Sequence, residues 1–201
     1  LRTVYIGGGT PTSLSADQLR QLMGKVARCF DLSRLEEYTV EAGRPDTIDR
    51  EKLEMLRDMR ISRISVNPQT FCDATLERIG RSHSGADTIA AYELARELGF
   101  TDINMDLIAA LPGETPEIFN ETLSRVIALG PESVTVHSLS IKRSSRLHEE
   151  MHVSGAGHSQ VSAAGAGEMI ACARARLMAA GWRPYYLYRQ KYMAGNLENV
   201  G

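Results

Sequence analysis

Polar side chains and bare backbone groups follow the predicted strands of this chain, at the points where the strands end. In chain order these positions are residues 7–10, Glu41, Asn67 with Gln69, Asp106, and His137 with Ser138 and Ser140. In a parallel α/β sheet the loops that follow the strands meet at one edge, and ligands bind there. Strand ends are also polar where burial simply stops, so each position alone has a structural explanation. Together their amide, hydroxyl and carboxylate groups predict a site for a polar ligand.

The glycine run at residues 7–9 has two interpretations. A tight turn with positive φ requires glycine for steric reasons alone. Without side chains, the backbone N–H and C=O groups can also approach a ligand closely, beside the helix that is predicted to start near Ser15. The run fits neither the G-x-G-x-x-G pattern nor the P-loop pattern, so dinucleotide and P-loop nucleotide binding are both disfavoured.

Alternating strands and helices are needed to position these groups. Short β-prone segments predict six strands, at residues 2–6, 37–42, 61–66, 102–108, 133–138 and 184–188. Helical patterns predict helices at residues 15–30, 50–59, 72–79, 87–98, 115–130 and 166–180. This alternation favours a parallel sheet, and it fits a doubly wound sheet and part of a β/α barrel equally well. Residues 142–167 show little periodicity and are interpreted as a long connection that is either mobile or a functional loop.

Several predicted helices carry recognisable start signals. Ser15 with Gln18 forms a capping-box pattern, Asp49 precedes the second helix, and Thr115 with Pro116 starts the fifth. After Ser15, apolar residues recur at intervals of three and four, which predicts one buried helix face. These residues are Leu19, Leu22, Met23, Val26 and Phe30.

Composition excludes several classes of protein. With 43% hydrophobic and 24% charged residues, the chain resembles a folded globular domain, and 201 residues suffice for one domain. A net charge of -2 offers no broad basic surface, so we expect no nucleic-acid or membrane partner. Cys29, Cys72 and Cys172 match no metal-ligand spacing, which predicts reduced thiols and no metal site in this chain. With no signal or membrane-spanning pattern, the expected location is the cytoplasm.

The segment YIGGGTPT at residues 5–12 resembles the second-strand motif of radical S-adenosylmethionine (SAM) enzymes, specifically the oxygen-independent coproporphyrinogen III oxidase group. Further blocks resemble successive segments of that family, at residues 40–41, 66–71, 79–83 and 104–116. The tail at residues 185–201 is similar to the branch called coproporphyrinogen dehydrogenase. The resemblance implies an α/β fold, a partial (β/α)6 TIM-like barrel of the radical SAM type that lacks its first strand.

The resemblance also implies cofactor contacts at the strand ends. By motif position, the backbone of Gly8, Gly9 and Thr10 meets the methionyl part of SAM, and Glu41 meets the same molecule. Carboxylate, hydroxyl and backbone groups suit SAM, which carries an amino group, a carboxylate and a ribose.

A second set of positions matches residues that bind a second SAM in the oxidase branch. These are Gln69, Arg81 and Asp106, and Ser140 matches a further cofactor-contacting position. Arg81 has the planar fork that binds a carboxylate with two hydrogen bonds. No catalytic residue is assigned.

For the complete protein the resemblance implies a 4Fe–4S cluster that cleaves SAM, and a radical that removes hydrogen from a propionate of coproporphyrinogen III. Loss of carbon dioxide then leaves a vinyl group, in a step of haem biosynthesis that needs an electron donor. The family's C-x-x-x-C-x-x-C cluster is not found before residue 7, so we expect a piece of a longer protein that is inactive alone. A haem-binding carrier with a related barrel is the alternative. An unrelated hydrolase or lyase ranks third, because no G-x-S-x-G motif supports it.

Overall fold

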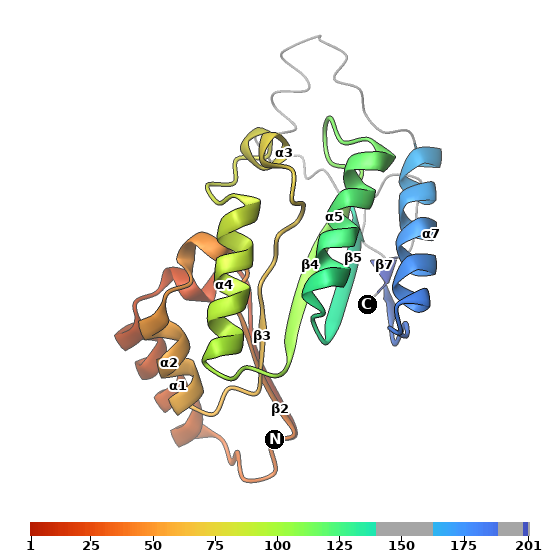
Figure 1. The fold of residues 1–201 in the computed structure, drawn as a ribbon. Coiled ribbons are helices and arrows are strands. Elements are labelled where there is room, and N and C mark those ends of the chain that lie inside the picture. The colour runs from red at the N-terminus through yellow and green to blue at the C-terminus, as the bar shows by residue number, and fades with distance from the viewer. Residues whose placement is uncertain (140–162, 189–198, 201) are drawn as a thin grey trace. The chain divides into compact units, whose positions relative to one another are not determined.

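The structure is a computed structural model, and it describes residues 1–139, 163–188 and 199–200 of the chain. The chain forms two compact units, each made of strands with helices packed beside them (Figure 1). The first unit contains residues 1–68 and 85–105, and the second contains residues 69–84 and 106–201. No helix in these described segments is both long enough and apolar enough to cross a bilayer.

The first unit is a parallel sheet with α1, α2 and α4 on one side of its strands (Figure 1). Its strands are β1 (Thr3–Ile6), β2 (Glu37–Glu41), β3 (Arg63–Ser65) and the first part of β4 (Ile103–Ala109). Its helices are η1 (Pro11–Ser13), α1 (Ala16–Cys29), η2 (Pro45–Thr47), α2 (Arg50–Asp58) and α4 (Gly85–Glu97). In the pairing register, Thr3 lies opposite Glu37 and Ile64 lies opposite Ile103. All four predicted strands and their helices are confirmed here.

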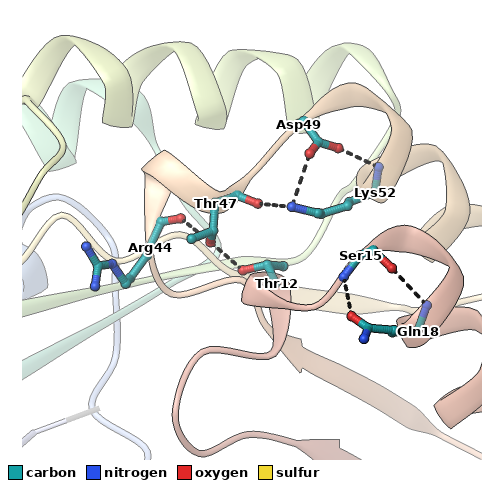
Figure 2. Close-up of polar contacts among 7 residues, drawn as sticks. All are labelled: Thr12, Ser15, Gln18, Arg44, Thr47, Asp49 and Lys52. Carbon is teal, nitrogen blue, oxygen red and sulfur yellow. Dashed lines mark hydrogen bonds and ion pairs between the residues drawn. The ribbon is translucent and has the colours of Figure 1, made fainter.

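Local capping explains where two of these helices begin. The Gln18 N–H donates to Ser15 Oγ at 3.2 Å, and the Ser15 N–H donates to Gln18 Oε1 at 3.0 Å (Figure 2). The Lys52 N–H donates to Asp49 Oδ1 at 2.8 Å. Each cap satisfies an N–H that has no partner inside the helix, so both predicted starts are confirmed.

The buried face of α1 is narrower than its apolar pattern predicts. Leu19 and Met23 are fully buried, as expected, whereas Leu22 is 40% exposed and Phe30 is 52% exposed. The prediction was wrong for these two residues. Phe30 is the C-cap and has extended backbone, so it no longer follows the helical face, and Leu22 lies beside the buried stripe.

The second unit combines the rest of β4 with one parallel neighbour and a short antiparallel edge. Its elements are α3 (Asp73–Arg78), α5 (Pro116–Leu129), β5 (Ser133–Ser138), α7 (Ala163–Ala179), β6 (Leu187–Tyr188) and β7 (Asn199–Val200). The Leu139 N–H donates to the Ala109 carbonyl at 3.1 Å beside β4. Strand β7 pairs antiparallel with β5 and β6. This two-residue strand was not predicted, because it is too short to show a period.

Helix α5 begins and ends as its sequence predicts. Thr115 Oγ1 accepts from the Ile118 N–H at 3.4 Å, Pro116 occupies the first turn, and Gly130 ends the helix with a left-handed φ of 67°. The buried side of α5 includes Phe119, and α5 packs against α7 (Figure 1). The loop before α5 joins it directly to the end of β4.

Candidate functional site

The glycine loop after β1 needs glycine for two different reasons. Gly8 and Gly9 have φ values of 81° and 59°, a left-handed backbone that other residues adopt only with strain. Gly7 allows a close approach, because a Cβ there would lie 2.5 Å from Tyr5 Cε1 and 2.9 Å from Glu41 Cδ and would displace these two side chains. The loop therefore exposes bare backbone at the end of β1, as the sequence predicts.

Glu41 holds this loop from the end of β2. Its Oε2 accepts the Gly8 N–H at 3.0 Å, and its Oε1 accepts the Tyr5 hydroxyl. The structure thus brings together Gly8 and Glu41, which were predicted to meet the same cofactor. Thr10 lies at the end of the loop, where its hydroxyl donates to the Gly9 carbonyl at 2.8 Å and shapes the turn. Each carboxylate oxygen of Glu41 can accept a second hydrogen bond, and a ligand could donate it.

A pair of threonine hydroxyls joins the loop after β1 to the loop after β2. Thr12 Oγ1 lies 2.6 Å from Thr47 Oγ1, and the Thr47 hydroxyl also contacts the Arg44 carbonyl at 2.7 Å (Figure 2). Lys52 Nζ donates to the Thr47 carbonyl at 2.9 Å and lies 3.1 Å from Asp49 Oδ2. This connection could not be predicted from the sequence, because the two threonines lie 35 residues apart.

Gln69 in the second unit has a strained backbone. Its φ of 65° is left-handed although it is not glycine. Its N–H donates to the Asp106 carbonyl at 3.0 Å, and its carbonyl accepts from the Ile108 N–H at 3.0 Å, which forms an isolated parallel bridge with Leu107. The carboxamide of Gln69 makes no hydrogen bond with any residue in the described part of the chain. This main-chain pairing places Gln69 beside Asp106.

Asp106 has a histidine neighbour to which the sequence pattern gave no role. His137 Nε2 lies 3.7 Å from Asp106 Oδ2, and both side chains are 23% exposed. His137 was identified only as a polar residue at a strand end. Arg81 lies in the same unit, three residues after α3, with a half-buried side chain. Ser140 lies outside the described residues.

The cysteines of this chain do not form an iron–sulfur site. Cys29 is exposed, and Cys72 and Cys172 are half-buried free thiols. In the segments that the structure describes, no group of three or more histidine, cysteine or acidic residues is placed to hold a metal ion. An iron–sulfur cluster needs several converging thiolates, so these residues do not fit one.

A separate cavity of ≈ 420 Å³ lies within the second unit. It is bounded by the start of β5, the end of α7 and the segment that follows α7, and its lining includes Val134, Leu177 and Trp182. The Trp182 side chain is fixed by a 3.0 Å hydrogen bond from Nε1 to the Pro131 carbonyl. The lining contains none of the predicted cofactor residues.

Comparison with known proteins gives consistent matches. Residues 1–126 match the Radical SAM superfamily. The chain is 48% identical over 201 residues to the oxygen-independent coproporphyrinogen-III oxidase-like protein HemZ of Bacillus subtilis, which covers 99% of this chain and 39% of HemZ. It is 42% identical over 143 residues to the heme chaperone HemW of the same organism, which covers 71% of this chain and 38% of HemW.

The fold matches a solved member of the same group. The structure of coproporphyrinogen III oxidase (HemN) from Escherichia coli, described as a radical SAM enzyme, aligns with a TM-score of 0.81 and 28% identity. The alignment covers 91% of this chain and 41% of HemN, so the chain spans well under half the length of these relatives. The predicted α/β fold of the radical SAM barrel is confirmed. Because the superfamily match includes the glycine loop, Glu41, Gln69 and Asp106, this chain belongs to the radical SAM superfamily.

Proposed function

We propose that the protein containing this chain is a SAM-dependent oxidoreductase that converts coproporphyrinogen III to protoporphyrinogen IX. The observation that carries this proposal is the extent of the similarity to the oxidase-like protein HemZ and to the oxidase HemN. The HemZ match covers 99% of the chain, and the HemN fold covers 91%. The match to the heme chaperone HemW of Bacillus subtilis covers less of the chain, 71%.

In this proposal the first unit binds the SAM that is cleaved. The backbone of Gly8, Gly9 and Thr10 binds the methionyl part, and Glu41 accepts hydrogen bonds from amino or hydroxyl groups of the same molecule. The hydrogen bond from Gly8 to Glu41 and the open backbone of the loop support this role. The carboxylate suits the task because it accepts hydrogen bonds and favours a cationic neighbour.

The second unit binds a further SAM through Gln69, Arg81 and Asp106, with Ser140 as an additional contact. The unbonded carboxamide of Gln69 supports this assignment, because it offers two donors and an acceptor from a fixed backbone. Arg81 supplies a planar fork for a carboxylate. Asp106 supplies an acceptor beside His137.

SAM with a reduced 4Fe–4S cluster supplies the radical chemistry, and the ligands of that cluster are proposed to lie outside this chain. In each of two rounds, a propionate of the substrate loses one hydrogen atom, one molecule of carbon dioxide and one electron, and a vinyl group remains. An electron donor reduces the cluster, and an acceptor takes the substrate electron. The free thiols are consistent with the cytoplasmic location that we propose.

Anaerobic expression of the full-length protein, with iron and sulfide reconstitution, tests this proposal. We expect a brown cluster, SAM cleavage, and porphyrinogen products that have lost, in each of two rounds, one molecule of carbon dioxide together with two hydrogen atoms. Failure to cleave SAM after reconstitution would exclude the radical enzyme. Cleavage without a decarboxylated product would instead point to another substrate.

A haem carrier is the second candidate, supported by the 42% identity to HemW. A carrier retains haem through gel filtration and produces no vinyl group from coproporphyrinogen III. The two measurements on one preparation therefore separate an oxidase from a carrier.

A further inference from the structure

A buried acid lies in the loop before α5, outside the residues proposed to bind SAM. Glu114 is 3% exposed and immediately precedes the cap residue Thr115. Its Oε1 accepts a hydrogen bond from Thr70 Oγ1, whereas its Oε2 is buried without a hydrogen-bond partner. No ion pair to Glu114 occurs within the described segments. A buried carboxyl with one satisfied oxygen is a poor source of stability, so another reason for it is needed.

The hydrogen bonds around Glu114 run in one direction. Thr70 Oγ1 accepts from the Cys72 N–H at 3.1 Å and lies 3.1 Å from Thr122 Oγ1, which accepts from the Phe71 N–H at 3.0 Å. Thr70 has a single hydroxyl hydrogen, and it uses it to donate a hydrogen bond to Glu114. Thr122 must therefore be the donor in its contact with Thr70. Glu114 is therefore the final acceptor of a network that fixes three consecutive residues.

Those three residues directly follow Gln69. Strand β4 holds both backbone groups of Gln69, whose φ is left-handed: its N–H donates to the Asp106 carbonyl, and its carbonyl accepts from the Ile108 N–H. Such a conformation persists in a buried non-glycine residue where the surrounding structure fixes it. The network that begins at Thr70 fixes the three residues after Gln69, and so the direction in which the chain leaves it.

We infer that Glu114 is a positioning residue, which fixes Thr70 and thereby holds the backbone that presents the Gln69 carboxamide to a bound SAM. This inference rests on the proposed role of Gln69. A purely structural role for Glu114 predicts lost stability without a change in the interaction between Gln69 and SAM.

SAM binding by the reconstituted full-length protein, measured as the amount bound at increasing SAM concentration, tests the inference. Gln69→Ala should weaken the affinity of one SAM by about tenfold, as expected for a lost buried hydrogen bond. Glu114→Ala and Thr70→Val should each weaken the same site by up to about tenfold, because Gln69 loses its fixed position. Glu114→Gln should retain the affinity, because its amide oxygen still accepts from Thr70.

The double variant Gln69→Ala/Glu114→Ala gives the sharpest result. If Glu114 acts through Gln69, the double variant binds SAM no more weakly than Gln69→Ala alone. Leu123→Ala is the matched control, because it removes a fully buried apolar side chain from α5 that makes none of these hydrogen bonds. It should lower the melting temperature and leave SAM affinity unchanged.

The outcomes separate the inference from the function on which it rests. Unchanged SAM binding in Gln69→Ala would overturn both the proposed role of Gln69 and the inference. Weakened binding in Gln69→Ala with unchanged binding in both Glu114→Ala and Thr70→Val would overturn the inference alone. Fully additive losses in the double variant would do the same, since they would show that Glu114 acts independently of Gln69.

Discussion

The two units stabilise their strand-end loops with similar hydroxyl networks that differ in the final acceptor. In the first unit, Thr12 and Thr47 are linked, and the network ends at the Arg44 carbonyl (Figure 2). In the second, Thr70 lies beside Thr122 and donates to the carboxyl of Glu114. A backbone carbonyl does not titrate, whereas a carboxyl does. The same kind of connection is therefore insensitive to pH in one unit and sensitive in the other.

The sign of the pH effect follows from burial. Burial raises the pKa of Glu114 from 4.5 to about 7, although the hydrogen bond from Thr70 opposes the rise. Below 4.5 the carboxyl is protonated in both the folded and the unfolded chain. Between 4.5 and about 7 the unfolded chain releases the proton while the folded chain keeps it, so stability falls as the pH rises. Above that window the loss is complete.

The largest expected effect on stability therefore comes from replacing Glu114 by a residue that does not titrate. A pKa difference of this size corresponds to about 3 kcal/mol of folding free energy. Glu114→Gln, which mimics the neutral acid, should gain stability relative to the wild type by up to about 3 kcal/mol between pH 4.5 and pH 8. Urea unfolding at several pH values measures the change.

Glu117→Gln is the control for that experiment. Glu117 lies in the first turn of the same helix, and hydrogen bonding to Thr115 lowers its pKa. It is ionised above pH 5 in both states, so its substitution should not alter the pH dependence there. If Glu114→Gln differed from the wild type by the same free energy of unfolding at every pH, the proposed difference in pH sensitivity between the two networks would be wrong.

The next largest effect concerns the carboxylate that ties the glycine loop. Glu41→Ala removes the acceptor for the Gly8 N–H and for the Tyr5 hydroxyl, and it also removes a proposed contact with SAM. We expect SAM affinity to fall by tenfold to about a hundredfold, since hydrogen bonds to charged groups contribute about 1.5 to 3 kcal/mol. Glu36→Ala, which breaks only an exposed ion pair with Arg2 just before β2, should bind SAM normally.

Asp106→Ala should have a smaller effect, confined to binding. The backbone carbonyl of Asp106, which the substitution keeps, holds Gln69. We expect SAM affinity to fall by about tenfold with little change in melting temperature. Unchanged binding with a large loss of melting temperature would show that Asp106 is structural.

The smallest effect is expected in the neutral network. Thr12→Val removes one hydroxyl from a fully buried position and should destabilise the protein by about 1 kcal/mol, equally at pH 5 and pH 8. Urea unfolding checks this, with the exposed Thr101→Val as the control. A loss that varies with pH would indicate that a titrating group also reaches the first network.

Much of the fold could be predicted because its signals are local. The caps at Ser15, Asp49 and Thr115 and the left-handed stop at Gly130 each depend on a few adjacent residues. The predictions failed where the signal was not local. The exposure of Leu22 depends on how much of α1 the neighbouring elements cover, which a period does not encode.

The candidate site shows the same division. Residue types and strand order were sufficient to identify Gly8, Glu41, Gln69 and Asp106, and the structure brings them together in pairs within each unit. The left-handed φ of Gln69 carried no sequence signal, because glutamine adopts that conformation only when its surroundings impose it.

The sequence by itself determined the alternation of strands and helices, the glycine loop and the family, because these depend on neighbouring residues and on motif order. Only the tertiary structure decided that Thr12 meets Thr47, and that Thr70 meets both Glu114 and Thr122. These partners lie 35, 44 and 52 residues apart along the chain. A hydrogen bond requires its two atoms within about 3 Å, and over such separations only the packing of the elements determines which atoms meet.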